Sequence, residues 1–171
     1  DMSGVIIKCR NAEVDCLIVY THDPEAAILT RQLNEMGLDV PVVGPTTFTL
    51  PTYLGLVTAE ETEGFYSVCD FVSGNPDPLA SEFQQAFNEK YGVDPDLFAA
   101  CYYTAIYVLK DAIERADEIT REDIQQALLE TKDLPSVYGT LYANEDGELV
   151  HSAVVAQIVD NAPVFSTVVH E

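Results

Sequence analysis

The chain has 171 residues, of which 47% are hydrophobic, and a formal net charge of −21. That length and composition allow a buried core, either as one domain or as two small lobes. So negative a chain repels nucleic acid and anionic membranes, and we exclude both as partners. A solvated surface explains the acidity more simply than adaptation to high salt, in which acidic surfaces resist salting out.

The chain opens with segments that predict a helix and then a strand. Asp1 and Ser3 can cap a short helix that continues to about Asn11. Residues 14–20 form a continuous apolar run, which is typical of a strand buried on both faces in a parallel sheet.

The segment from Asp23 to Gly37 predicts an amphipathic helix. Asp23 suits the N-cap, Pro24 the first helical position, and Glu25 the positive end of the helix dipole. Gly37 ends the helix. Its predicted apolar stripe consists of Ile28, Leu29, Leu33 and Met36. Further buried strands are predicted at 40–44 and 65–72, with a short helix between them, so the first seventy residues predict an open parallel α/β sheet.

A turn-rich segment at 73–78, "SGNPDP", is the best candidate for a linker. Three helices are predicted after it, over 79–91, 97–116 and 120–131, the last with a capping box from Thr120 and Asp123. The apolar stripe of the middle helix is Phe98, Tyr102, Ala105, Ile106, Leu109 and Ile113. The period of the hydrophobic pattern then changes. Antiparallel strands in hairpins are predicted over 139–143, 149–160 and 163–169.

Motifs for catalysis, nucleotides and metals are absent from the sequence. It contains no G-x-G-x-x-G, no P-loop and no G-x-S-x-G elbow. Its three histidines are far apart, and its four cysteines lack zinc spacing. We read Cys16, Cys69 and Cys101 as small buried hydrophobic residues, while a bridge between Cys9 and Cys16 remains open. The sequence therefore predicts no enzyme, no cofactor and no metal.

The connections that follow the predicted strands carry polar groups suited to holding a small molecule. In an open α/β sheet, ligands bind beyond the carboxyl ends of the strands. "YTHDP" and "GPTTF" follow the first two strands there and supply hydroxyls, an imidazole, a carboxylate and a ring. The candidate ligand contacts in these loops are His22, Asp23, Thr46, Thr47 and Phe48.

The order of segments resembles the second half of the type I solute-binding proteins of ABC transporters, in particular the Leu/Ile/Val (branched-chain amino acid) binding family. The matching stretches are "DMSGVIIKCRNAEVD", "DPEAAILTRQLNEMGLDVPVVGP", "AEETEGFYSV", "NPDPLASEFQQAFNEKYGVDPDLFAACYYTAIYVLKDAIERA" and "YGTLYANEDGELV". They cover nearly the whole chain in the family's order. None is diagnostic alone, whereas the ordered set is specific.

This resemblance implies a two-lobed receptor that closes over a solute and delivers it to a membrane permease. It places residues 1–72 in the second lobe, and 73–137 in a linker and helices that pack with the first lobe. Residues 138–171 become a β-hairpin tail that crosses back. The expected location is periplasmic, or extracellular with a membrane anchor. The chain corresponds to the C-terminal half of such a protein.

The resemblance also assigns roles by position. His22 falls where amino-acid-binding members place an aromatic contact, and Phe98 where they place a tyrosine near the hinge; Tyr102 is a further candidate. Thr46 falls where they place an acidic residue that pairs with the ligand's ammonium. A hydroxyl cannot supply that charge-assisted bond, so either Asp23 compensates or the ligand is an amide, a carboxylate or an aromatic acid.

Each candidate also has a structural interpretation. Asp23 suits a helix N-cap, His22 an exposed loop, and Thr46 and Thr47 a turn before Pro51. Phe48 can hold its loop on the sheet, and a helical core stripe explains Phe98 and Tyr102.

Two other functions remain open for this chain. One is a sensory or regulatory ligand-binding domain of the same fold, and the other is a small α/β enzyme whose site lacks a known motif. We also expect helices meant for the first lobe to expose apolar faces here, so that the fragment self-associates.

Overall fold

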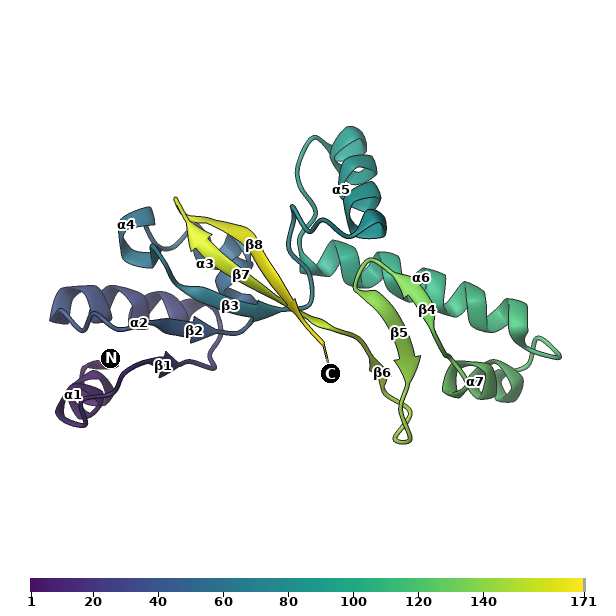
Figure 1. The fold of residues 1–171 in the computed structure, drawn as a ribbon, viewed down its shortest axis with the longest axis horizontal. Coiled ribbons are helices and arrows are strands. Elements are labelled where there is room, and N and C mark those ends of the chain that lie inside the picture. The colour runs from purple at the N-terminus through teal and green to yellow at the C-terminus, as the bar shows by residue number, and fades with distance from the viewer. Residues whose placement is uncertain (171) are drawn as a thin grey trace. The chain divides into compact units, whose positions relative to one another are not determined.

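The computed structural model describes residues 1–170, which form two compact units (Figure 1). Unit 1 contains Asp1–Val72 and Val154–Thr167, and unit 2 contains Ser73–Ala153 and the residues from Val168 onward. The chain therefore passes from one unit to the other three times: after Val72, after Ala153 and after Thr167.

Unit 1 is an α/β unit built around a five-stranded sheet of order β1-β2-β3-β7-β8. β1 pairs with β2, and β2 with β3, in parallel, as predicted. β3 pairs with β7 antiparallel, with Ser67 opposite Ala156. The elements of this unit are α1 (Ser3–Asn11), β1 (Leu17–Ile18), α2 (Asp23–Met36), β2 (Val42–Gly44), the 3-10 helix η1 (Thr46–Thr49), α3 (Pro51–Leu54), α4 (Ala59–Thr62), β3 (Tyr66–Cys69), β7 (Ala153–Val159) and β8 (Ala162–Val169).

The strand predicted over residues 14–20 is much shorter and is not buried on both faces. Leu17 and Val19 pack against the core of unit 1. Ile18 and Tyr20, which alternate with them, are 85% and 92% exposed. Successive side chains of a strand point to opposite faces, and within the described chain only one face of β1 is covered. A continuous apolar run does not reveal this, because both faces are apolar.

Helix α2 has the predicted length but starts with a different cap. The N-cap is His22, in an extended conformation, and Asp23 is the first helical residue and makes no capping bond. The N-cap assignment of Asp23 was therefore wrong by one residue, since Pro24 is accepted at either of the first two helical positions. Gly37 ends the helix with φ 65°, as predicted. The buried face, Ala26, Ala27, Thr30 and Leu33, is rotated from the predicted stripe toward the smaller side chains.

The core of unit 1 lies between α2 and the sheet. Phe48 from η1 stacks on Tyr53 with ring centroids 5.0 Å apart, and the Tyr53 hydroxyl pairs with Thr30 Oγ1 at 2.8 Å. Burial raises the pKa of Tyr53 to about 12. A Cβ added at Gly44 would lie 2.5 Å from the Phe48 ring. Gly44 thus provides the flat surface on which the ring rests.

The C-terminal hairpin of the sheet was predicted, although its turn is one residue earlier. Asp160 and Asn161 both have positive φ, of 50° and 59°, which is the geometry of a tight two-residue hairpin turn. The segment 149–160, predicted as one strand, divides into β6 (Leu149–Val150) in unit 2 and β7. His151 and Ser152 separate them, close to a passage between units.

Unit 2 combines three helices with a three-stranded sheet of order β4-β5-β6. The helices are α5 (Pro78–Tyr91), α6 (Leu97–Arg115) and α7 (Arg121–Leu129), and the remaining strands are β4 (Leu134–Ser136) and β5 (Gly139–Ala143). The strand at 139–143 was predicted, but β4 was not. β4 pairs with β5 antiparallel, with Pro135 opposite Thr140.

Side-chain caps start all three helices of unit 2. Asp77 accepts from Leu79 N and Ala80 N, and Asp96 accepts from Ala99 N. The predicted cap at Thr120 is confirmed, because its hydroxyl accepts from Asp123 N at 3.1 Å. The second half of the predicted capping box is absent: the Asp123 carboxylate accepts from the Thr120 hydroxyl at 2.6 Å. Asp is too short to reach the backbone as Glu does.

The cysteines are free thiols with different degrees of exposure in the described part of the chain. Cys69 is buried, as predicted, and burial raises its pKa to about 12. Cys16 and Cys101 are exposed, so their predicted burial was wrong. Cys16 is exposed because β1 begins only after it, and Cys101 is exposed because it does not lie on the buried stripe of α6.

Helix α6 buries a narrow stripe of small residues and exposes its large ones. Ala100, Thr104, Val108 and Ala112 are its buried positions. The predicted stripe lies on another side of the helix and is exposed at every position: Phe98, Tyr102, Ala105, Ile106, Leu109 and Ile113. This stripe contains no charged residue, although the chain as a whole is strongly acidic. Exposed apolar patches of this kind mark surfaces that pack against something else.

We therefore expect the isolated 171-residue chain to self-associate through the exposed stripe of α6. Light scattering should show dimers or larger species at concentrations of about 0.1 mM and above. The variant Ile106→Lys should shift the distribution toward monomer, because it places a charge within the stripe. Gln125→Lys, on exposed surface of α7, adds the same charge and should leave association unchanged. A wild-type chain that stays monomeric at high concentration would contradict this prediction.

Candidate functional site

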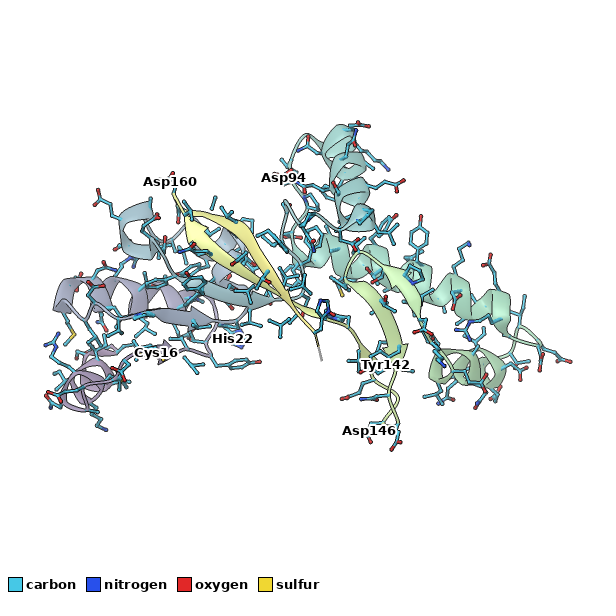
Figure 2. The ribbon with its side chains drawn as sticks, viewed as in Figure 1. Cys16, His22, Asp94, Tyr142, Asp146 and Asp160 are labelled. Carbon is cyan, nitrogen blue, oxygen red and sulfur yellow. The ribbon has the colours of Figure 1, made fainter. Side chains whose placement is uncertain are left out.

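Two loops of unit 1 meet at the edge of its sheet where the parallel strands β1 and β2 end. One contains Thr21, His22 and Asp23, and the other contains Thr46, Thr47 and Phe48. A direct hydrogen bond joins them, since the Thr47 hydroxyl donates to the Thr21 carbonyl at 3.1 Å. Figure 2 labels His22, where β1 gives way to α2. The structure thus brings the five predicted residues of unit 1 to one edge.

His22 and Thr46 present unpaired polar groups at this edge. His22 is exposed, and its imidazole makes no capping bond. Thr46 is half-buried and its carbonyl accepts from the Thr49 hydroxyl at 2.8 Å, whereas its own hydroxyl has no hydrogen-bond partner among residues 1–170. Both side chains are therefore available for hydrogen bonds to a small molecule.

Asp23 is half-buried and held in place by a neighbour from another element. The Thr52 hydroxyl, on α3, donates to Asp23 Oδ2. Because Asp23 does not cap its own helix, this contact and the α2 backbone fix its carboxylate. Thr52 is an exposed residue with no sequence signal that relates it to Asp23, and sequence reasoning missed it.

Thr47 and Phe48 form the inner layer of the edge. Thr47 is buried and uses its hydroxyl to tie the loops together. Phe48 is 1% exposed and packs against Phe65 as well as Tyr53. This placement favours the structural interpretation of Phe48, in which the ring holds the loop on the sheet. No role in supporting Phe48 was assigned to Gly44 from the sequence. The only sign of that role in the sequence is that Gly44 ends a predicted strand four residues before Phe48.

The two remaining candidates, Phe98 and Tyr102, lie on α6 in unit 2. They are 54% and 74% exposed, so a core position within the described chain does not explain them. Their spacing of four residues places them on one side of the helix. Their predicted role in lining a cleft stays a prediction.

Unit 2 also contains an aromatic groove of about 540 Å³ between α5, α6 and β4. The rings of Phe83 and Tyr103 meet across it in a tilted arrangement with centroids 4.6 Å apart, and the Phe87 and Tyr91 centroids lie 4.6 Å apart along α5. Thr104 lines it, with a buried hydroxyl that has no partner among the described residues. None of the seven predicted site residues lines this groove, so it is separate from the polar edge of unit 1.

Residues 1–170 contain no group of three or more His, Cys, Asp or Glu side chains placed to hold a metal ion. Within the same residues, none of the helices combines the length and apolar character that a membrane span needs. The polar edge offers hydroxyls, an imidazole and one carboxylate.

An open α/β sheet with polar loops at the carboxyl ends of its parallel strands is the framework of a small-molecule binding module. Residues 1–163 match the family model described as periplasmic binding protein. The chain belongs to this family, as its ordered segments predicted.

Individual relatives agree with this membership. A leucine-, isoleucine-, valine-, threonine- and alanine-binding protein from Pseudomonas aeruginosa is 27% identical over 150 residues, which are 87% of this chain and 39% of the relative. The crystal structure of a leucine binding protein from Thermotoga maritima superposes with a TM-score of 0.89 at 26% identity, covering 99% of this chain and 49% of that one.

A more distant neighbour shares the fold alone. It is a solute-binding protein of an ABC transporter from R. palustris in complex with benzoate, with a TM-score of 0.79, 17% identity, and coverage of 98% of this chain and 46% of that one. The chain thus spans about two fifths of the length of the curated relatives, and about half that of the solved structures. These neighbours confirm the predicted type I periplasmic-binding-protein fold, present in part, and the relatives are solute-binding proteins.

The variant Phe48→Ala tests whether Phe48 acts through the core. Truncating a buried phenylalanine typically costs about 3–5 kcal/mol, so we expect a destabilisation of that size in urea unfolding. Phe98→Ala, at an exposed ring on α6, is the matched control and should change stability by no more than about 0.5 kcal/mol. An unchanged unfolding midpoint for Phe48→Ala would return Phe48 to the list of ligand contacts.

Proposed function

We propose that this chain is part of the extracytoplasmic solute-binding component of an ABC uptake transporter. It binds an amino acid or a related small polar solute, for which the polar edge of unit 1 forms one wall of the cleft. The observation that carries the proposal is the family match over residues 1–163, together with unpaired polar side chains at the edge where ligands bind in such sheets.

The composition of the edge suits binding without reaction. His22 and Thr46 supply hydrogen-bonding groups that the described chain leaves unpaired, while Thr47 and Phe48 keep the loops rigid. A rigid layer beneath a few polar contacts is the usual construction of a binding site, since preorganised groups lose little entropy on binding. The relatives of this chain are solute-binding proteins, so the proposed role is not enzymatic.

The division of the chain agrees with a two-lobed receptor. The three passages between units, after Val72, Ala153 and Thr167, support a proposal in which two lobes move about a hinge. In this proposal residues 1–72 belong to the second lobe, 73–137 link to and cover the first, and 138–171 cross back. Phe98 and Tyr102 keep their predicted role as cleft-lining residues. The proposed partner is a membrane permease, and the proposed location is periplasmic, or extracellular with a membrane anchor.

A thermal-shift screen of the full-length protein against amino acids, amides and small organic acids tests this function. A ligand that binds only the folded state stabilises it, by about 2.7 kcal/mol at a hundredfold excess over Kd, and therefore raises the melting temperature. We expect a shift of several degrees with one chemical class. A screen in which nothing shifts the melting temperature would remove the support for solute binding.

Variants of the two unpaired residues test the location of the site. Loss of one neutral hydrogen bond is worth about 0.5–1.5 kcal/mol, so His22→Ala and Thr46→Ala in the full-length protein should each weaken binding about 2- to 12-fold. Both should keep the wild-type melting temperature without ligand. His170→Ala and Thr140→Ala remove the same side chains at positions of unit 2 and should leave affinity unchanged. Equal affinity for all four variants and the wild type would place the site elsewhere.

A further inference from the structure

The aromatic groove of unit 2 contains a buried hydroxyl that the described chain leaves unpaired. Thr104 on α6 is 6% exposed and lines the groove, and its Oγ1 has no hydrogen-bond partner within residues 1–170. A threonine inside a helix can place its hydroxyl on the carbonyl four residues earlier, here that of Ala100. That bond is not made, so the hydroxyl is available to a molecule that enters the groove.

Thr104 is the exception among the buried polar side chains of residues 1–170. The buried hydroxyls of Thr62 and Thr131 donate to the carbonyls four residues earlier, at 3.1 and 3.5 Å. The other buried polar side chains also make hydrogen bonds: Thr30, Thr47, Ser67 and Asn75. An unpaired buried hydroxyl costs free energy, which a partner recovers. The pattern therefore favours a ligand that supplies the missing partner of Thr104.

The walls of the groove are aromatic and uncharged. Tyr103 and Tyr107 lie one turn apart on α6 with ring centroids 4.7 Å apart, and the centroids of Phe83 and Phe87 on α5 are 5.8 Å apart. A hydrogen bond to Tyr107, together with partial burial, raises the pKa of Tyr103 to about 12, so this phenol stays neutral at physiological pH. Aromatic walls favour a flat ring, which packs against them in offset or edge-to-face contacts.

The charged side chains that line the groove balance each other. They are Glu82 and Lys90, both on α5, and Lys90 Nζ lies 5.2 Å from the centroid of the Tyr91 ring. The buried polar group of the groove, the Thr104 hydroxyl, is neutral. A charged ligand would lose its hydration here without gaining a counter-charge beside that hydroxyl, which is costly. The lining therefore favours an uncharged ligand.

We propose that the aromatic groove is a second binding site, for a small uncharged aromatic molecule with one hydroxyl or amide group that pairs with Thr104. Its volume of about 540 Å³ is typical of small-molecule pockets, which combine mostly apolar walls with a few polar groups. The lining residues all belong to unit 2 and include none of the polar edge of unit 1. The inference therefore does not rest on the proposed solute-binding function.

NMR titrations of the full-length protein with related para-substituted toluenes test the class of ligand. 4-Methylphenol carries a hydroxyl, p-xylene has a methyl group in its place, and 4-methylbenzoate and 4-methylbenzylammonium carry a negative and a positive charge. We expect 4-methylphenol to bind about 10-fold or more tightly than either charged probe, because the groove offers no counter-charge beside its buried hydroxyl.

The variant Thr104→Val tests the role of the hydroxyl. It replaces the hydroxyl with a methyl group, so 4-methylphenol should bind about 2- to 12-fold more weakly, the worth of one neutral hydrogen bond. Binding of p-xylene should not weaken. Because the lost hydroxyl is unpaired, the melting temperature of the ligand-free variant should equal or exceed that of the wild type.

Thr131→Val is the matched control for this variant. The Thr131 hydroxyl is also buried in unit 2, but it is paired with the Ala127 carbonyl and does not line the groove. Its removal should lower the melting temperature, because a hydrogen bond is lost. The affinity for 4-methylphenol should stay the same.

Several results would overturn the proposal. One is an affinity for 4-methylphenol that is unmeasurable, unchanged by Thr104→Val, or lower than that for a charged probe. Binding to the 171-residue chain that is lost in the full-length protein would show that the rest of the protein occupies the groove. An affinity that falls as the protein concentration rises would show that a second copy occupies it.

Discussion

The hydrogen bond from Thr47 to the Thr21 carbonyl, above the buried ring of Phe48, is the constraint on which the candidate site depends. It joins the loops after β1 and β2, which the chain would otherwise leave as independent connections. Phe48 can occupy this position only because Gly44 has no side chain beneath it. The loop backbone is thus fixed from below, while the outward groups of His22 and Thr46 remain free. In the segment "GPTTF", the supporting residues Thr47 and Phe48 directly follow Thr46.

Features set by neighbouring residues were predictable from the sequence. The cap at Thr120 and the left-handed glycine at Gly37 were predicted, whereas the cap of α2 lies one residue before the predicted Asp23. Each depends on contacts within about four residues, so one sequence contains the necessary information. The edge at which the candidate residues gather was predictable for a similar reason, because polar residues directly follow the parallel strands β1 and β2.

Features set by distant partners were not predictable. The antiparallel pairing of β3 with β7 joins segments about ninety residues apart, and nothing in "YSVC" indicates the direction of its neighbour. The partial exposure of β1 and the full exposure of the α6 stripe have a common cause. An apolar side chain indicates that some surface covers it, but it does not indicate which segment provides that surface. For these two faces, no segment of the described chain provides it. The tie between Thr52 and Asp23 is a side-chain contact of the same unpredictable kind.

The few basic residues of unit 1 do not neutralise the acidic side chain at its polar edge. A protein with many carboxylates on a solvated surface can tolerate them singly, because water screens each one. At the polar edge the situation differs, since Asp23 is half-buried and Arg10 and Arg31 are bound to backbone carbonyls of other segments. The backbone contacts that stabilise α2 and the loop after α3 thereby also leave the edge negative.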